Sequence, residues 1–429
     1  MSGKKKWILI KSQVQAVSRK KMFSQKFALK LFEGFSIQRW TDLVRPFDIV
    51  EMDKAAEKMV LGYIIGKYEE NKGNFIDWTW MIYASLFDLL SKIALCDIKA
   101  PVLDMLKREY TQEYLHLNEW VLKLYKPLLC DKELFSKFTI YTGQKAGQIP
   151  VPEKSRLASR VFSAANKFAT LRELQMLKTV NEPERLEQIN RELQEQIQHY
   201  LDLAGMQNLV THQRSYSLLL KIEQLRFQIR WNQTPRVPKT SVLGHCFFVA
   251  ILTLLLCRES GAKMSEKRII NNFFTGLFHD LPEAVTRDII SPVKQATDEL
   301  PNIVKKIEDE IVNKELVPLM EPFFVDELMY FTSNEFANRI KNSKGQTEVV
   351  SWQELNEKYN SVEFSPVDGR TVRIADHISA LMEADISIKH GITSDHLKFG
   401  RKNMLENYPA GKIINGIDVG KIFKEIAEN

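Results

Sequence analysis

The chain has 429 residues, more than a single hydrophobic core usually serves, so two domains are expected. Hydrophobic residues make up 44% and charged residues 27% of the sequence, a balance that excludes a wholly disordered chain. The formal net charge of +6, from 60 Lys and Arg against 54 Asp and Glu, suits an anionic substrate, but so small an excess is also typical of ordinary solvated surfaces.

The cysteines and the N-terminal segment indicate the cellular compartment in which the protein is expected. Cys96, Cys130, Cys246 and Cys257 form no C-x-x-C pair and have mostly apolar neighbours, which is typical of reduced, packed thiols rather than disulfides or a zinc knuckle. The basic segment MSGKKKWILIK has an apolar run too short for the core of a signal peptide. We therefore expect a cytoplasmic protein.

Apolar residues recur at spacings of three and four through most of the chain, and alternating runs are scarce, so the sequence predicts an all-α protein. Residues 181–205 are rich in charge, but Leu186, Ile189 and Leu193 lie on one stripe and Pro183 lies near the start. This pattern predicts a long amphipathic helix, which either connects two domains or packs on the periphery of one of them.

The next segment joins a capping sequence to the longest apolar run in the chain. Thr240 and Ser241 supply capping hydroxyls directly before this run, so His245 is expected in the first turns of a buried helix. The apolar run at 246–257 is far shorter than the ~20 residues that cross a membrane. A buried core helix is predicted rather than a membrane span.

Two later segments place ionisable groups on apolar helix faces. His279 and Asp280 end an apolar segment, with Glu283 three residues on, and burying such groups without partners would cost on the order of several kcal/mol. Residues 342–370 break into Gly, Ser, Asn and Pro, which predicts a loop insertion. Asp376 follows in a third amphipathic helix. Imidazoles and carboxylates are natural ligands of divalent metals, so a metal ion bound from three helices would remove the cost.

A constant offset of 191 positions links the two halves and favours an internal duplication over a chance repetition of helical dipeptides. The matching dipeptides are Arg39-Trp40 with Arg230-Trp231, Leu86-Phe87 with Leu277-Phe278, Asp97-Ile98 with Asp288-Ile289, and Pro101-Val102 with Pro292-Val293.

The first copy lacks the ionisable set of the second. At the offset of 191, the positions of His245, His279, Asp280 and Glu283 hold Lys54, Asp88, Leu89 and Lys92. Ser159 matches Asp376 only at a different offset. The first half is therefore predicted not to bind metal in the same way.

The order His245, His279-Asp280, Asp376 resembles the H…HD…D pattern of the HD-domain metal-dependent phosphohydrolases, over residues 226–392. The flanking residues Arg230-Trp231, Glu283, Thr286-Arg287-Asp288 and Pro292-Val293-Lys294 are similar to those of bacterial 5′-deoxynucleotidases of the YfbR type.

This resemblance implies an all-α fold of two HD-like helical bundles in tandem, joined by the long connector helix. The expected parts are a degenerate HD-like domain at 1–175, the connector helix at 176–210 and a catalytic HD domain at 211–429. Because enzymes of the YfbR type resemble single bundles that pair as homodimers, the degenerate half is expected to pack on the active half as an internal pseudo-dimer partner.

The resemblance also implies roles for individual residues. His245, His279, Asp280 and Asp376 would hold one divalent metal ion, and this ligand set leaves its identity open among Co, Mn, Mg, Fe and Zn. Glu283 would be the acid/base carboxylate, Asp288 would accept a hydrogen bond from a sugar hydroxyl, and the substrate-binding residues would be Arg230, Trp231 and Lys294. Alternatively, Arg230, Trp231 and Asp288 serve folding, since the first half keeps Arg39, Trp40 and Asp97.

The expected reaction is hydrolysis of nucleoside 5′-monophosphates, with deoxynucleotides as one option, by a metal-activated water. One alternative keeps the metal site but acts on nucleoside triphosphates or a signalling nucleotide. Another is a nucleotide-sensing or scaffold protein with residual catalysis. No glycine-rich phosphate loop or zinc-finger spacing is present and the basic residues are scattered, so neither a nucleic-acid partner nor a membrane partner is expected.

Overall fold

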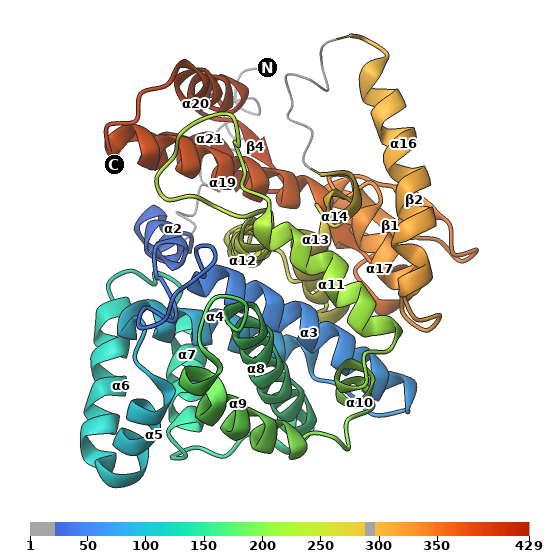
Figure 1. The fold of residues 1–429 in the computed structure, drawn as a ribbon. Coiled ribbons are helices and arrows are strands. Elements are labelled where there is room, and N and C mark those ends of the chain that lie inside the picture. Colours follow the sequence, from blue (N-terminus) through green and yellow to red (C-terminus); the bar gives the residue numbers. More distant parts are fainter. Residues whose placement is uncertain (1–21, 288–296, 429) are drawn as a thin grey trace, which may run out of the picture.

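The structure is a computed structural model, and it describes residues 22–287 and 297–428 (Figure 1). Helices dominate these residues, which confirms the predicted all-α class. The first half of the chain occupies the lower part of Figure 1 and the second half the upper part.

The first half is built around α3 (Glu51–Asn71), which packs against α4 (Trp78–Leu95) and α8 (Arg156–Leu177). The other elements here are α2 (Gln25–Phe32), η1 (Glu33–Phe35), α5 (Ala100–Glu109), α6 (Thr111–Tyr125), α7 (Lys132–Lys145), η2 (Glu153–Ser155), α9 (Pro183–Gln198) and α10 (Ala204–Val210). Most of α3 is buried, including six charged residues: Glu51, Asp53, Lys54, Glu57, Lys58 and Glu69. Each of these needs a partner, because an unpaired buried charge is costly.

The second half is built around α12 (Val242–Glu259), which packs against α13 (Glu266–Phe278) and α19 (Gly369–Lys389). Its other helices are α11 (Arg214–Phe227), α14 (Glu283–Thr286), α16 (Leu300–Glu315), η3 (Val317–Leu319), α17 (Val325–Thr332), α18 (Trp352–Glu357), η4 (Val362–Phe364), α20 (Asp395–Asn407) and α21 (Val419–Glu428). Of the predicted metal ligands, His245 lies in α12, Asp376 lies in α19, and His279 and Asp280 directly follow the end of α13.

The predicted connector helix is wrong as a single element. The chain forms two helices there, α9 and α10, separated by a turn after Gln198. The stripe of α9 buries Leu186, Leu193 and Ile197, and it packs on α8. The segment is thus a peripheral helix of the first half, the alternative that the sequence left open.

Residues 342–370 are only partly a loop. They contribute to a three-stranded antiparallel sheet in the order β2-β1-β3, formed by β1 (Asn338–Lys341), β2 (Thr347–Val349) and β3 (Val367–Asp368), and they include α18 and η4. A second pair, β4 (Ile413–Ile414) and β5 (Ile417–Asp418), lies near the C-terminus. The strands were not predicted, because segments of two to four residues give too little alternation to detect.

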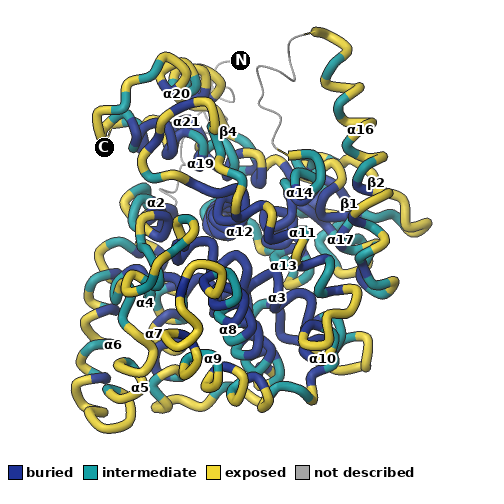
Figure 2. Tube along the Cα trace, viewed as in Figure 1, coloured by how far each residue is buried: buried dark blue, intermediate teal, exposed yellow. Residues whose placement is uncertain are grey.

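The predicted buried helix around His245 is confirmed. The Ser241 hydroxyl caps α12 by accepting a hydrogen bond from the backbone N–H of Gly244 at 2.9 Å. Within the described ranges, α12 is the one helix with the length and apolar composition of a membrane span, but 89% of it is buried at the centre of the core (Figure 2).

The two halves share one continuous apolar core, whereas the chain length suggested separate cores. α3 packs directly against α12, and the ring of Tyr63 in α3 lies 5.0 and 5.2 Å, centroid to centroid, from Phe274 and Phe278 in α13. Figure 2 shows this buried layer running between the halves. The first half therefore supports the helices that carry the site.

A buried ion network also joins the halves. Arg226 of α11 is fully buried, and its guanidinium lies 2.8 Å from a carboxylate oxygen of Glu57 in α3 and 3.1 Å from one of Glu173 in α8. Burial would raise the pKa of Glu173, but Arg39, Lys54 and Arg226 outweigh it and hold the pKa at about 2. Glu173 thus stays charged and depends on these cations.

We expect the substitution Arg226→Met to destabilise the chain by ~3–5 kcal/mol, because it leaves buried carboxylates without their cation. Equilibrium urea unfolding measures the change. Arg185→Met is the matched control, since Arg185 pairs with Glu182 in full solvent exposure and its loss should not be measurable. Equal unfolding midpoints for the two variants would contradict the proposed role of Arg226.

Candidate metal centre

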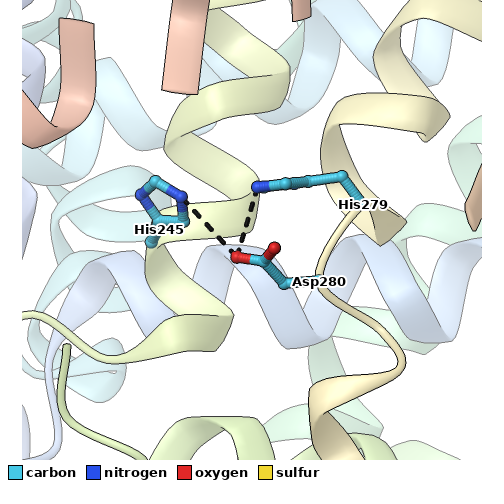
Figure 3. Close-up of side chains that lie close together, drawn as sticks. All are labelled: His245, His279 and Asp280. Atoms are coloured by element: carbon cyan, nitrogen blue, oxygen red, sulfur yellow. Dashed lines mark ion pairs between the residues drawn. The ribbon is translucent and has the colours of Figure 1, made fainter. Parts of the chain in front are cut away.

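Three ionisable side chains meet where α12 passes the end of α13 (Figure 3). His245 lies in the first turn of α12, His279 is the C-cap residue of α13, and Asp280 follows it. One ligand atom from each lies within 4.8 Å of the other two. The structure therefore contains a possible His/Asp metal site.

Asp376, the fourth predicted ligand, adjoins this group from α19. Its Oδ1 atom lies 3.3 Å from His245 Nε2. Oδ2 of Asp280 lies 3.8 Å from the same nitrogen and 3.2 Å from His279 Nε2. The four residues predicted from the sequence are thus brought together from three separate parts of the chain.

Each imidazole is oriented through its Nδ1 atom. His279 Nδ1 lies 2.8 Å from the carbonyl oxygen of Gly276, which can only accept, so Nδ1 carries a proton. His245 Nδ1 lies 2.9 Å from the Ser379 hydroxyl. Both Nε2 atoms are buried and lack a hydrogen-bond partner within the described part of the chain. In both rings Nε2 is therefore the nitrogen turned toward the carboxylates, as in metal sites whose histidines are held from behind.

The two carboxylates stay ionised. Burial would raise the pKa of Asp280, but His279 and His245 outweigh it and hold the pKa at about 2. Burial is likewise outweighed at Asp376, where His245 and Arg230 keep the pKa well below its usual range. At His279 the nearby Asp280 overcomes burial and raises the pKa well above the ordinary value. The space between His279 and Asp280 thus favours a cation, either a proton or a metal ion.

Arg230 lies beside this group and is held by a buried glutamate. Its Nε atom lies 3.2 Å from Glu383 Oε1, and its terminal nitrogens lie 3.8 Å from Asp280 Oδ2 and 3.9 Å from Asp376 Oδ1. Glu383 also accepts hydrogen bonds from the Trp231 indole N–H at 2.8 Å and from the Thr240 hydroxyl at 2.8 Å. One carboxylate therefore fixes the segment that carries Arg230.

Sequence reasoning missed Ser379 and Glu383. Both lie on α19, three and seven residues after Asp376, so all three are on one side of the helix. Glu383 is 1% exposed and sits between Met382 and Ala384, both buried. The sequence signal for Glu383 was an acidic residue inside an apolar run. Asp376 was identified by the same signal.

Glu283 is less simply placed than the sequence suggested. The prediction put it one turn beyond His279 and Asp280 on the same helix, but α13 ends at Phe278 and Glu283 begins the short helix α14. The chain turns between them, and the Glu283 N–H donates to the carbonyl oxygen of Asp280 at 3.0 Å. Burial raises the pKa of the Cys246 thiol; His279 lowers it, and the charges of Asp280 and Glu283 raise it.

The remaining predicted residues divide into two groups. Trp231 has a positive φ of 56°, its indole N–H is bonded to Glu383, and its ring packs so closely on Gly400 that a Cβ there would lie 2.7 Å from it. These contacts favour the folding role, and substrate binding by Trp231 stays a prediction. Asp288 and Lys294 lie outside the described residues.

The first half repeats the Arg-Trp arrangement around a different centre. Arg39 and Trp40 donate to Glu173 of α8 at 3.1 and 2.8 Å, as Arg230 and Trp231 do to Glu383. Asn166 stands seven residues before Glu173, the spacing that separates Asp376 from Glu383, so this spacing favours Asn166 over Ser159 as the counterpart of Asp376.

In the first half, ammonium groups occupy the region of the missing ligands. Lys54, at the position of His245, donates to the Asn166 carbonyl at 3.0 Å and to the Thr170 hydroxyl at 2.5 Å. Asp88, at the position of His279, forms an ion pair with Lys58. Built-in cations are therefore present where the second half has a candidate metal site.

Comparison with known proteins agrees with this geometry. Residues 222–404 match the sequence profile of the HD domain. The chain is also 27% identical over 208 residues to the 4′-phosphooxetanocin A phosphatase of Priestia megaterium, in an alignment that covers 45% of this chain and 87% of that protein. Both matches support a phosphohydrolase.

We expect Ser379→Ala to weaken binding of a divalent ion by roughly 10- to 100-fold, because His245 would lose the hydrogen bond that orients its ring. Titration of the metal-free protein with Mn²⁺ or Co²⁺ measures the affinity. Ser387→Ala is the control, since Ser387 lies on the same helix but bonds to Val237. An unchanged affinity in Ser379→Ala would show that the hydroxyl does not position the ligand.

A pH dependence should arise from Lys54. Burial lowers its pKa from 10.5 to about 7, although Glu173 acts in the opposite direction. Between these values the unfolded chain binds a proton that the folded chain does not, so Lys54 adds stability as pH rises from 7 to 10.5. The free energy of unfolding of the native chain, relative to Lys54→Met, should increase by up to ~1.4 kcal/mol per pH unit in this window. A constant difference in urea unfolding between pH 7.5 and 9 would contradict this.

Proposed function

We propose, from the premise that residues 222–404 form a domain of the HD superfamily, that this protein is a metal-dependent phosphatase of nucleoside 5′-monophosphates. The observation that carries the proposal is the convergence of two imidazole Nε2 atoms on two ionised carboxylates, with a guanidinium beside them. This combination suits a cation and a phosphate group together.

We propose His245, His279, Asp280 and Asp376 as the ligands of one divalent ion. The fit rests on the buried Nε2 atoms, which have no hydrogen-bond partner in the described ranges and lie 3.2 and 3.3 Å from carboxylate oxygens. Two nitrogen and two oxygen donors suit Co, Mn, Mg, Fe or Zn, so the ligand set does not select among them. When bound, such an ion supplies Lewis acidity and makes water a nucleophile near neutral pH.

The chain's own residues would bind and orient the substrate. Glu383 holds the Nε side of Arg230, and the terminal nitrogens lie within 4 Å of Asp280 and Asp376, where a phosphate oxygen would approach the ion. A planar guanidinium can pair two oxygens of a phosphate. We assign Glu283 as the carboxylate that moves a proton during the reaction. Trp231 and Lys294 remain candidates for substrate binding, and Asp288 remains the candidate that accepts a hydrogen bond from a sugar hydroxyl.

The nucleotide substrate is inferred from sequence resemblance to known phosphatases and not from the shape of the candidate site. The relative from Priestia megaterium is named as a phosphatase of 4′-phosphooxetanocin A, which supports removal of phosphate from a small molecule. The flanking residues similar to 5′-deoxynucleotidases support a nucleoside 5′-monophosphate. The proposed compartment is the cytoplasm, in keeping with four free thiols.

We further propose that the two halves are copies of one HD-like bundle, the first of which is degenerate and serves as an internal partner. Three paired features support this at the same offset of 191: the isolated bridges Gln38–Val50 and Ile229–Ser241, the positive φ of Trp40 and Trp231 (57° and 56°), and the starts of α3 and α12. This proposal retains the two expected HD-like domains, residues 1–175 and residues 211–429.

Two substitutions separate the proposed roles. His279→Ala should lose both the metal ion and phosphatase activity, because it removes a ligand. Glu283→Gln should keep the metal ion but lose activity by roughly 10²- to 10⁴-fold, the range expected of an acid/base group. Metal content by elemental analysis and phosphate release from purified protein give the two readouts.

The substrate is tested with a panel of nucleoside mono-, di- and triphosphates and cyclic nucleotides, each with Co²⁺, Mn²⁺ or Mg²⁺. Release of phosphate from monophosphates in preference to the others supports the proposal. Preferential turnover of triphosphates or a signalling nucleotide would overturn the substrate assignment, and turnover of none by metal-loaded protein would overturn the activity itself.

A further inference from the structure

A second arginine reaches the candidate metal centre from α19. Arg373 lies three residues before Asp376, so both residues are on the same side of the helix. The Arg373 Nη1 atom lies 3.5 Å from Oδ2 of Asp376. The side chain of Arg373 is 47% exposed, whereas that of Arg230 is 15% exposed. Of the two guanidinium groups beside the proposed ligands, Arg373 is therefore the more accessible to a molecule arriving from solvent.

An aromatic ring also holds Arg373 in place. The guanidinium carbon of Arg373 lies 4.4 Å from the centroid of the Phe336 ring, within the range in which a cation and an aromatic face attract each other. Phe336 lies between α17 and β1, and its ring lies 6.0 Å, centroid to centroid, from the imidazole of His279 in an edge-to-face arrangement. Arg373 is thus held by a carboxylate and by a ring that both adjoin the candidate metal centre.

The carboxylate of Asp376 has a guanidinium group near each of its oxygens. Oδ1 lies 3.9 Å from Arg230 Nη2, and Oδ2 lies 3.5 Å from Arg373 Nη1. Asp280 and Asp376 together match the two charges of a divalent ion, and Glu383 matches the charge of Arg230. Among these groups, the charge of Arg373 is left without a counterpart when an ion is bound. A positive charge left over at an exposed edge attracts an anion.

The two halves of the chain differ at this position. Arg373 stands ten residues before Glu383, and the residue ten before Glu173 in the first half is Ser163, whose hydroxyl donates to the backbone carbonyl of Ser159. The first half keeps the Arg-Trp pair and its buried glutamate, but it lacks the candidate metal ligands. Under the proposed duplication, Arg373 belongs with the residues that only the second half has, as expected of a residue that serves a ligand rather than the fold.

We propose that Arg373 is a substrate-binding residue that makes the site prefer phosphomonoesters to phosphodiesters. This inference rests on the proposed phosphatase function. A bound ion, Arg230 and Arg373 offer three partners, and a phosphomonoester has three terminal oxygens where a diester has two. Near neutral pH the phosphate of a monoester also carries close to two negative charges, whereas that of a diester carries one. Nucleoside monophosphates are thereby favoured over cyclic nucleotides, which are diesters.

The test measures binding of two stable anions, inorganic phosphate and dimethyl phosphate, to the full chain loaded with Mn²⁺, by isothermal titration calorimetry. Arg373→Gln should bind inorganic phosphate roughly 10- to 100-fold more weakly, because one charge-assisted contact is lost, while its affinity for dimethyl phosphate should hardly change. Arg370→Gln is the matched control. Arg370 is an exposed arginine in the first turn of the same helix, and it makes no ion pair within the residues that the structure describes.

A purely structural role for Arg373 predicts a different result. In that case Arg373→Gln lowers the urea unfolding midpoint or the Mn²⁺ content, and the protein that does hold Mn²⁺ binds phosphate as the native chain does. Arg373→Lys, which keeps the charge but not the planar fork, should recover part of the phosphate affinity. The inference is wrong if the loaded native chain does not bind phosphate, if loaded Arg373→Gln binds it with native affinity, or if both anions lose affinity by the same factor.

Steady-state kinetics with dAMP keep this inference separate from the proposed function. Arg373→Gln should raise KM more than it lowers kcat, because the contact forms when the substrate binds. If the native chain binds phosphate through Arg373 but releases none from dAMP, the phosphatase proposal fails and the assignment of Arg373 stands on binding. If Arg373→Gln hydrolyses dAMP with the native KM, the assignment of Arg373 fails and the phosphatase proposal stands.

Discussion

The structure around the candidate site depends on the need to satisfy one buried charge. Glu383 is 1% exposed on α19, and an unpaired carboxylate there would cost several kcal/mol, on the order expected for any buried ion. Arg230, Trp231 and Thr240 meet this need together, so the segment that precedes α12 is tied to α19. The same tie sets the distance between Arg230 and the two aspartates and fixes the entry of the chain into the helix that carries His245.

The residues that meet at the candidate metal centre were predictable because each has a local signature. His245 follows a capping hydroxyl and begins an apolar run, and His279-Asp280 interrupts another. In both places a polar group is buried, which indicates that it has a partner there. Glu383 and Ser379 have the same kind of signature, but their partners lie more than 130 residues away, and a buried acid does not reveal by its sequence which residues it binds. The H…HD…D pattern includes the candidate ligands but neither Ser379 nor Glu383, which orient His245 and Arg230.

The errors in the fold have causes in tertiary structure. The apolar stripe of α9 continues past Gln198, but the chain turns so that Gly205 lies against α3, where a Cβ would be 2.6 Å from the backbone of Ile65. Tertiary packing thus ended a helix that the periodicity would have prolonged. The strands between 338 and 368 are held by pairing with one another and by the buried Arg268–Asp368 ion pair, neither of which leaves a periodic trace in the sequence.

The two halves supply positive charge beside their central helices in two different ways. Each has a long central helix, a Trp in the left-handed region, and a buried glutamate that accepts from an Arg-Trp pair. In the second half the neighbouring imidazoles and carboxylates leave a place for an exchangeable cation. In the first half Lys54 and Lys58 supply amino groups covalently: Lys54 donates to the Asn166 carbonyl, and Lys58 pairs with Asp88. Under the proposed duplication, lysine stands where the second half has a candidate histidine ligand, and an ammonium group cannot activate water as a metal ion can.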